Sequence, residues 1–190
     1  TDFSNAWLGT SALTSFPAGA KLGTEATNVN FDSAWRQSGL TSFSTPLPTA
    51  NAVGAAWYGC LSLTSFSSSL PTATNVSFSW YNSAISSFSC QLPLATNVFQ
   101  TWSFCGFLTS FDIPLPSATL MNQAWRFCTA LTDFSADVFA NWNPSSISSG
   151  VFHATWANCT SLTAQSVENI LTSIDASGHY ATTNKLQGGT

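Results

Sequence analysis

The chain has 190 residues, of which 44% are hydrophobic, and it carries only four Lys plus Arg against eight Asp plus Glu. This length fits one domain with a continuous core. So few cations cannot neutralise a run of phosphates, which excludes nucleic acid as a partner, and no apolar run reaches the about 18 residues of a membrane span.

A tryptophan-centred repeat runs along most of the chain. In its four most regular copies a Leu-Pro pair starts ten residues before the tryptophan, an Ala lies seven before it, and a Leu-Thr-Ser-Phe-like run follows it. Seven repeats have this tryptophan: Trp7, Trp35, Trp57, Trp80, Trp102, Trp125 and Trp156. Because a fixed period of this size is typical of solenoids, the sequence predicts a β-rich solenoid of about seven 22–23-residue turns over residues 1–162.

Within one repeat, the residue types predict a short strand, a turn and a return path. The segment from Leu63 to Ser68 has the β-branched and aromatic residues of a strand, with Leu63 and Phe66 as core anchors. The Leu70-Pro71 pair turns the chain, because proline cannot donate to a β-ladder. The tryptophan then points inward, so we expect the tryptophan column to be core rather than a row that binds sugars.

Four cysteines share one repeat position, three residues after the tryptophan: Cys60, Cys105, Cys128 and Cys159. Free cysteine is among the most buried residue types, so we expect small buried thiols here. The backbones of neighbouring turns lie close enough for a disulfide, which is the alternative. Without a paired Cys-x-x-Cys motif the sequence predicts no zinc site, and it indicates no cofactor.

Two repeats are longer than the others. The extra residues fall in 17–25 and 140–150, and insertions in repeat proteins form surface loops that often carry the binding face. Trp142 is the one tryptophan outside the repeat frame. We therefore expect its side chain to be exposed and available to a ligand.

The repeat pattern stops after Trp156. Apolar residues at helical spacing follow it: Val167, Ile170, Leu171 and Ile174. They predict an amphipathic capping helix over residues 163–176, with Thr163 or Ser166 as the N-cap. Residues 177–190 are expected to form a tail or linker, and the Gly-Gly-Thr end indicates a fragment of a longer polypeptide.

The repeat resembles the BspA-like leucine-rich repeats, whose unit runs roughly Cys-x-x-Leu-x-x-Ile-x-Leu-Pro with a later Ala-Phe before the next Cys. The segment from Cys60 to Phe66, the Leu70-Pro71 pair and Trp80 occupy those places, with Trp substituting for the late Phe. The phrase Ala-Trp-x-x-Cys-x-x-Leu-Thr-Ser-Phe is also similar to repeat regions of marine bacteriophage fibre and structural proteins. The resemblance implies a leucine-rich-repeat-like coil, display and adhesion on a virion or cell surface, and no shared catalytic residues.

One candidate binding surface follows the tryptophan at a corner of the repeat. Arg36, Tyr58 and Tyr81 come directly after it in three repeats, and Phe104 and Phe127 lie one position further on in two others. Aromatic rings flanked by arginine are suited to stacking on sugar rings or on a partner's aromatic side chains. Aromatic packing under a turn is the alternative.

A second candidate is the uncharged strand face. Thr and Ser recur along it, Thr64 and Thr109 among them, and no charged residue occurs from Gln37 through Phe111. Such a flat hydroxyl array can match a glycan or the lattice of ice. Solvated strands without a ligand have the same composition, so that alternative stays open.

Acidic and catalytic groups are few. Asp112, Asp133 and Asp137 are expected to gather at neighbouring strand ends, where oxygen ligands for calcium and plain solubilising charge are the alternatives. Neither His153 nor His179 is tied to a nucleophile by a known motif. The sequence therefore predicts no enzymatic activity and no resident metal.

Together these features predict a non-enzymatic recognition or adhesion module of a phage tail fibre or other exposed virion structural protein. Its expected partner is a host cell-surface glycan or protein, with other virion subunits and homo-oligomerisation left open. The alternatives are a purely structural virion decoration or spacer and a bacterial cell-surface adhesin. An ice-binding role is a further alternative.

Overall fold

The computed structural model of the chain describes residues 1–143, 147 and 150–178. Its regular elements, in chain order, are β1 (Val29–Asn30), β2 (Ser42–Phe43), β3 (Ala50–Ala52), β4 (Ser65–Phe66), β5 (Ser110–Phe111), β6 (Asp133–Phe134), the 3-10 helix η1 (Ala136–Val138) and α1 (Ala164–Ala176). The strands pair in parallel as three two-stranded sheets, β1 with β3, β2 with β4, and β5 with β6. Neither helix of this part of the chain is long and apolar enough to cross a bilayer.

The predicted fold class is wrong. A β-rich solenoid of about seven 22–23-residue turns requires strands that pair from turn to turn along its whole length. The described residues instead contain six strands of two or three residues each, in three separate small sheets, with one 3-10 helix and one α-helix. Irregular chain connects these elements.

The physical reason lies in the backbone on either side of each repeat tryptophan. The residues two before and two after the tryptophan have positive φ in all seven repeats; around Trp80 they are Phe78 (φ 57°) and Asn82 (φ 52°). A left-handed residue cannot continue a β-strand, and the Leu-Pro pair removes a further backbone donor. These features interrupt extended backbone around each tryptophan and at each Leu-Pro pair, and the regular strands of the described residues are two or three residues long.

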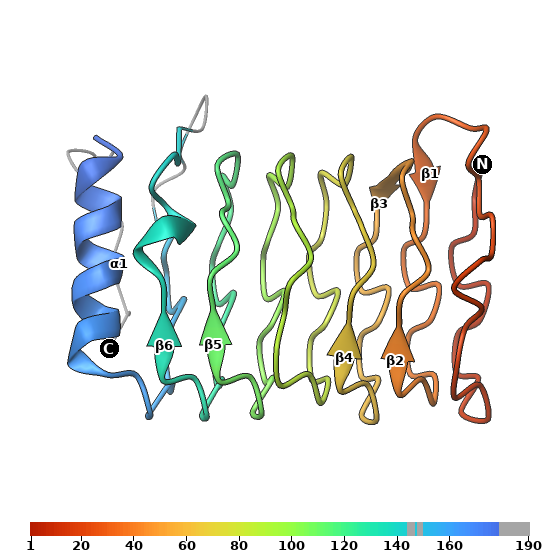
Figure 1. Ribbon diagram of the computed structural model, residues 1–190, viewed down its shortest axis with the longest axis horizontal. Helices are drawn as coiled ribbons and strands as arrows, with labels where there is room; N and C mark the ends of the chain where they lie inside the picture. The colour runs from red at the N-terminus through yellow and green to blue at the C-terminus, as the bar shows by residue number, and fades with distance from the viewer. Residues whose placement is uncertain (144–146, 148–149, 179–190) are drawn as a thin grey trace.

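Successive repeats lie side by side in a row that ends at α1 (Figure 1). Backbone amides link each repeat to the next: Trp57 N–H donates to Ser79 O at 2.9 Å, and Trp80 N–H donates to Thr101 O at 3.0 Å. The same offset of one repeat places equivalent side chains over one another.

The repeat tryptophans form the core, as predicted. The five with no exposed surface are Trp35, Trp57, Trp80, Trp102 and Trp125. From Trp7 to Trp156, neighbouring indole rings stack with centroids 5.1–5.9 Å apart and planes within 9° of parallel. Phenylalanine rings pack edge-on beside them, as Phe111 does against Trp102 at 4.7 Å and 64°. Because each aromatic pair contributes about 0.5–1.5 kcal/mol beyond the area it buries, this column is a main source of stability.

All five cysteines are free and buried. The prediction of buried thiols is confirmed for the four that share a repeat position, and the disulfide alternative is wrong. A thiol of this set donates to the tryptophan carbonyl of the preceding repeat, as Cys105 Sγ does to Trp80 O at 3.0 Å. Burial raises the pKa of Cys105 to about 11 and the pKa of Cys90 and of Cys159 to about 12. These thiols are therefore uncharged and unreactive at neutral pH.

Helix α1 lies at the end of the row beside β6 (Figure 1). Thr163 is its N-cap, and the Thr163 side chain accepts a hydrogen bond from Ser166 N–H. Ser166 Oγ in turn accepts from Phe134 N–H at 2.9 Å, and Asn169 Nδ2 donates to Phe134 O at 2.9 Å. The helix thus satisfies backbone groups of the last strand. The division into residues 1–162, 163–176 and a tail stays a prediction, and 179–190 lie outside the described residues.

Candidate binding surface

Side chains that follow the repeat tryptophans come together as one row, here called the corner row: Arg36, Tyr58, Tyr81, Phe104, Phe127 and Arg126. Each of them is at least partly exposed. Tyr58 and Tyr81 stack face to face, with ring centroids 4.7 Å apart and planes 3° from parallel. Burial and then the neighbouring phenol of Tyr58 raise the pKa of Tyr81, so its hydroxyl stays protonated at neutral pH. The structure therefore unites five of the predicted site residues.

The corner row stays continuous although its rings do not all come from the same position of the repeat. Tyr58 and Tyr81 directly follow their tryptophans, but in the next repeat that place is taken by Ser103, which is buried. Phe104, one residue later, supplies the ring instead, 5.3 Å from Tyr81 at 51°. It stacks in turn on Phe127 at 4.6 Å and 18°.

A guanidinium group covers the ring at each end of the row. Arg36 Cζ lies 4.6 Å from the ring centroid of Tyr58, and Arg126 Cζ lies 4.9 Å from that of Phe127. Arg126 is fixed further by a hydrogen bond from Nη1 to Gln123 Oε1 at 3.1 Å. Each cation–π contact contributes about 0.5–1 kcal/mol at an exposed site. Because most ring faces are covered within the row, it presents mainly ring edges to solvent.

Two of these rings stand on strained backbone. Phe104 has φ 63° and Phe127 has φ 60°. The equivalent residues of the two preceding repeats are Gly59 and Asn82, types that tolerate the left-handed region. A larger residue there costs of order 1–3 kcal/mol, and such strain is concentrated at functional sites. The same conformation recurs two residues after every repeat tryptophan, so it belongs to the repeat backbone and fixes where these two rings stand.

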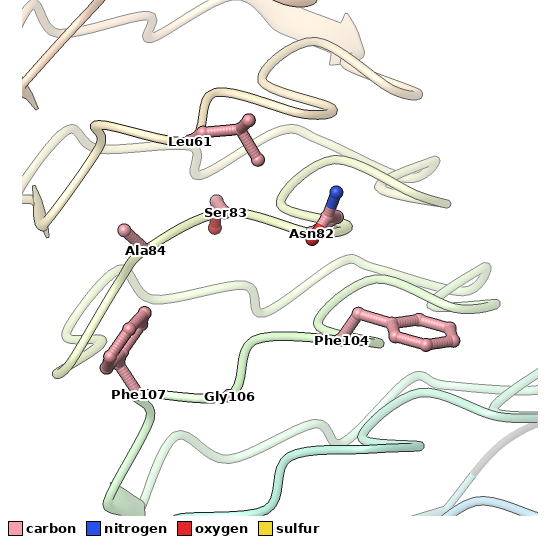
Figure 2. Close-up of a pocket in the computed structure, with 7 residues that line it drawn as sticks. All are labelled: Leu61, Asn82, Ser83, Ala84, Phe104, Gly106 and Phe107. Atoms are coloured by element: carbon pink, nitrogen blue, oxygen red, sulfur yellow. The ribbon is translucent and has the colours of Figure 1, made fainter.

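A hollow of about 160 Å³ opens beside Phe104. It is lined by Leu61, Asn82, Ser83, Ala84, Phe104, Gly106 and Phe107. Figure 2 shows Leu61 and Phe107 on opposite sides of the Ser83–Ala84 segment, with Phe104 at the other end of the Gly106 turn. Leu61 is 68% exposed and Phe107 is 66% exposed. The hollow therefore has apolar walls that project into solvent.

A second hollow of about 360 Å³ shares Leu61, Ala84 and Phe107 with the first and adds Thr64 and Ser86. Thr64 is exposed, and its hydroxyl donates to a backbone carbonyl of the preceding repeat at 3.2 Å. What this hydroxyl offers a ligand is therefore its acceptor capacity. The two hollows form one surface that joins the corner row to the strand face.

The structure separates the two predicted threonines and adds two residues that sequence reasoning missed. Thr64 lines the second hollow, whereas Thr109 is exposed but lines neither hollow. Leu61 and Phe107 were missed because single exposed apolar residues are common on protein surfaces. The available signal was spacing, since the repeat between them is one residue shorter after its tryptophan than its neighbours.

Trp142 is buried, so the prediction of an exposed side chain is wrong. Its side chain is 1% exposed. Its Nε1 donates to Ala118 O at 2.6 Å, and its ring lies 5.3 Å from that of Phe152. An indole with a hydrogen-bond acceptor in reach is stable in the core, so the inserted segment enlarges the core here. Residues 144–146 and 148–149 of that segment lie outside the described residues.

The three aspartates do not form a metal site. Nowhere in the described part of the chain do three or more His, Cys, Asp or Glu side chains form a group that could hold a metal ion. Asp112, Asp133 and Asp137 therefore do not belong to such a group. His153 is exposed, and His179 lies outside the described residues.

Comparisons with protein-family models, with curated proteins and with solved structures give no match to this chain. The two hollows and the corner row offer aromatic groups, amides and hydroxyls, and their only charged groups are the guanidinium groups at the ends of the row. Such a surface suits a neutral ligand that is held by apolar packing and hydrogen bonds.

Proposed function

We propose that the chain is a non-enzymatic recognition module that binds a glycan on a host surface. The observation that supports this most is Phe107, which is 66% exposed beside the equally prominent Leu61 on an uncharged surface. Leu61 and Phe107 line the same hollow, and adjacent exposed apolar side chains form the kind of patch that can mark a binding site. The C–H face of a pyranose ring packs well on an aromatic face, and its hydroxyls pair with amides and hydroxyls at the rim.

The tyrosine pair and Phe107 have different roles in this proposal, because their ring faces differ in accessibility. Tyr58 and Tyr81 cover each other's faces, and Arg36 covers the outer face of Tyr58. Phe107 makes no ring contact with another aromatic residue of the described chain. The ring that can stack on a sugar is therefore Phe107, and the tyrosines frame the surface beside it.

Replacing Phe107 with alanine is expected to weaken glycan binding about tenfold or more, because the stacking face is lost. A glycan array identifies binding sugars, and calorimetry measures the affinity of the variant. Leu94→Ala is the matched control, since Leu94 is also an exposed large apolar residue (48%) and lines neither hollow. Equal affinity of the Phe107 variant and the unmodified chain would remove this residue from the site.

The proposed setting is the surface of a virion, as part of a tail fibre or another exposed structural protein that attaches to a host. The resemblance of the repeat to BspA-like repeats and to repeat regions of marine bacteriophage proteins supports this setting. A bacterial cell-surface adhesin with the same binding surface is the alternative. Immunogold labelling of virions and of host cells with an antibody against this chain distinguishes the two.

A structural role as a virion decoration or spacer is favoured by one observation at the end of the row opposite α1. There the core aromatic residues Phe3, Trp7 and Phe16 are only partly buried. If this face packs on another subunit, the isolated chain is expected to self-associate, and sedimentation velocity is expected to show Trp7→Ser reducing that association. A stable monomer at high concentration would count against the structural role.

A further inference from the structure

The hollow beside Phe104 arises from a difference in repeat length. Trp80 and Ile85 are five residues apart, whereas Trp57 and Leu63 in the repeat before, and Trp102 and Leu108 in the repeat after, are six apart. The shorter repeat recedes between its two neighbours. Leu61 and Phe107 from those neighbours then form opposite walls (Figure 2).

A short repeat does not by itself produce a hollow. Trp35 and Leu40 are also five residues apart. There the backbone closes the space: a Cβ placed on Gly39 would clash with Ser11 O, and Gly39 N–H donates to Thr10 O at 3.2 Å. At the equivalent place of the Trp80 repeat the hollow stays open. The opening is therefore a specific feature of this repeat.

The size of the two hollows indicates what each can hold. Pockets that enclose a whole small ligand measure roughly 300–1,000 Å³. The first hollow, at about 160 Å³, is smaller than that and suits a single substituent. The adjoining hollow, at about 360 Å³, is large enough to receive a ring.

The lining indicates the chemistry of that substituent. Ala84 and Leu61 supply apolar contact, while the exposed Asn82 amide at the rim can both donate and accept. None of the lining residues of either hollow is charged. A carboxylate, sulfate or phosphate would find no cation in the hollow to offset the loss of its hydration. The group that fits is neutral, with an apolar end next to an amide.

We infer that the first hollow receives the acetamido group of an N-acetylhexosamine whose ring packs on Phe107. The methyl group lies between Leu61 and Ala84, and the amide pairs with Asn82. The strained Phe104 closes the hollow on the side of the corner row. This inference rests on the proposed glycan-binding function and specifies the sugar class that the same surface selects.

Two trisaccharides that differ only in the acetamido group test this. We expect the β1→4 trimer of N-acetylglucosamine to bind at least about tenfold more tightly than the β1→4 trimer of glucose, since burial of a small apolar group in a pocket is worth about that much. Ala84→Leu fills the hollow and is expected to abolish the preference. Ala130→Leu is the matched control, because Ala130 also directly precedes the apolar anchor of its repeat and lines neither hollow.

Leu61→Ser removes one wall without disturbing the core, because Leu61 is largely exposed, and it is expected to reduce the same preference. Equal affinity of the unmodified chain for both trimers, or an unchanged preference in Ala84→Leu, would overturn the acetamido assignment while leaving glycan binding intact. Absence of binding to any sugar on an array would overturn the proposed function itself. A preference that is lost in Ala84→Leu and kept in Ala130→Leu supports the assignment.

Discussion

Replacing Trp102 with alanine is expected to lower the free energy of unfolding by about 3–5 kcal/mol. Trp102 has no exposed surface and stacks on Trp80 at 5.9 Å and on Trp125 at 5.2 Å. Its loss interrupts the column in the middle of the row. Since single domains have only about 5–15 kcal/mol of net stability, this change removes a large part of it. Urea denaturation followed by circular dichroism measures the effect.

Replacing a buried tryptophan with phenylalanine separates the contribution of the ring to stability from that of the indole nitrogen. Trp102 Nε1 is buried and has no hydrogen-bond partner among the described residues, and a buried donor without a partner costs about 1–3 kcal/mol. Trp102→Phe removes this donor while keeping a ring, so its net cost is expected to be within about 1 kcal/mol. Trp142→Phe is expected to cost more, because Trp142 Nε1 donates to Ala118 O. The reverse order of the two variants would refute this account.

Raising the pH from about 8 to about 11 is expected to destabilise the fold steeply. Burial raises the pKa of Cys90 and of Cys159 from 9.0 to about 12, and that of Cys105 to about 11. Above pH 9 the unfolded chain loses these protons while the folded chain keeps them, so unfolding becomes more favourable as the pH rises. The contribution of the protonated thiols to the free energy of unfolding is fully present below about pH 9 and is lost by about pH 12. Each thiol contributes about 1.4 kcal/mol per pH unit within its window.

Chemical denaturation at a series of pH values measures this slope, with Cys105→Ser as the matched variant. Serine occupies the same repeat position naturally at Ser38 and Ser83, and it does not ionise in this range. The variant is expected to lose stability less steeply between about pH 9 and about pH 11, by about 1.4 kcal/mol per pH unit. Identical slopes for both chains would show that ionisation of this thiol is not involved.

The core was predictable from the sequence because large apolar residues recur at a fixed spacing. Trp80 holds a repeat position at which other repeats also have tryptophan. Cys105 holds one at which other repeats also have small residues. The burial of both follows from the period alone. The helix was predictable for a similar reason. Ile170 and Ile174 are buried on one face of α1, and Thr163 has the side chain that an N-cap needs.

The strand content was not predictable, because the residues that break the strands have no common type. Ser33, Ala55 and Phe78 all have positive φ two residues before their tryptophans, although none of them is a residue that favours this region. Packing of the tryptophans and hydrogen bonds between repeats impose the conformation, and local preference does not reveal it. The expected β-rich solenoid failed for this reason.

The candidate site was predictable only in part. Tyr58, Tyr81 and Phe104 were predicted from their position after the tryptophan. That position does not determine which ring faces are exposed to solvent. Phe107 and the hollow depend on one missing residue in a neighbouring repeat, whose effect on side-chain exposure follows only from three-dimensional packing. Trp142 was assigned wrongly because a residue outside a repeat can still fill a gap in the core.

The stacked tryptophan column also has an optical consequence. Indole rings that lie 5.1–5.9 Å apart and almost parallel are close enough for strong coupling of their electronic transitions. Unfolding separates the rings, so the spectroscopic signature of this coupling is expected to disappear with the fold. The folded chain therefore carries its own spectroscopic reporter, which records whether all seven repeats are still in register.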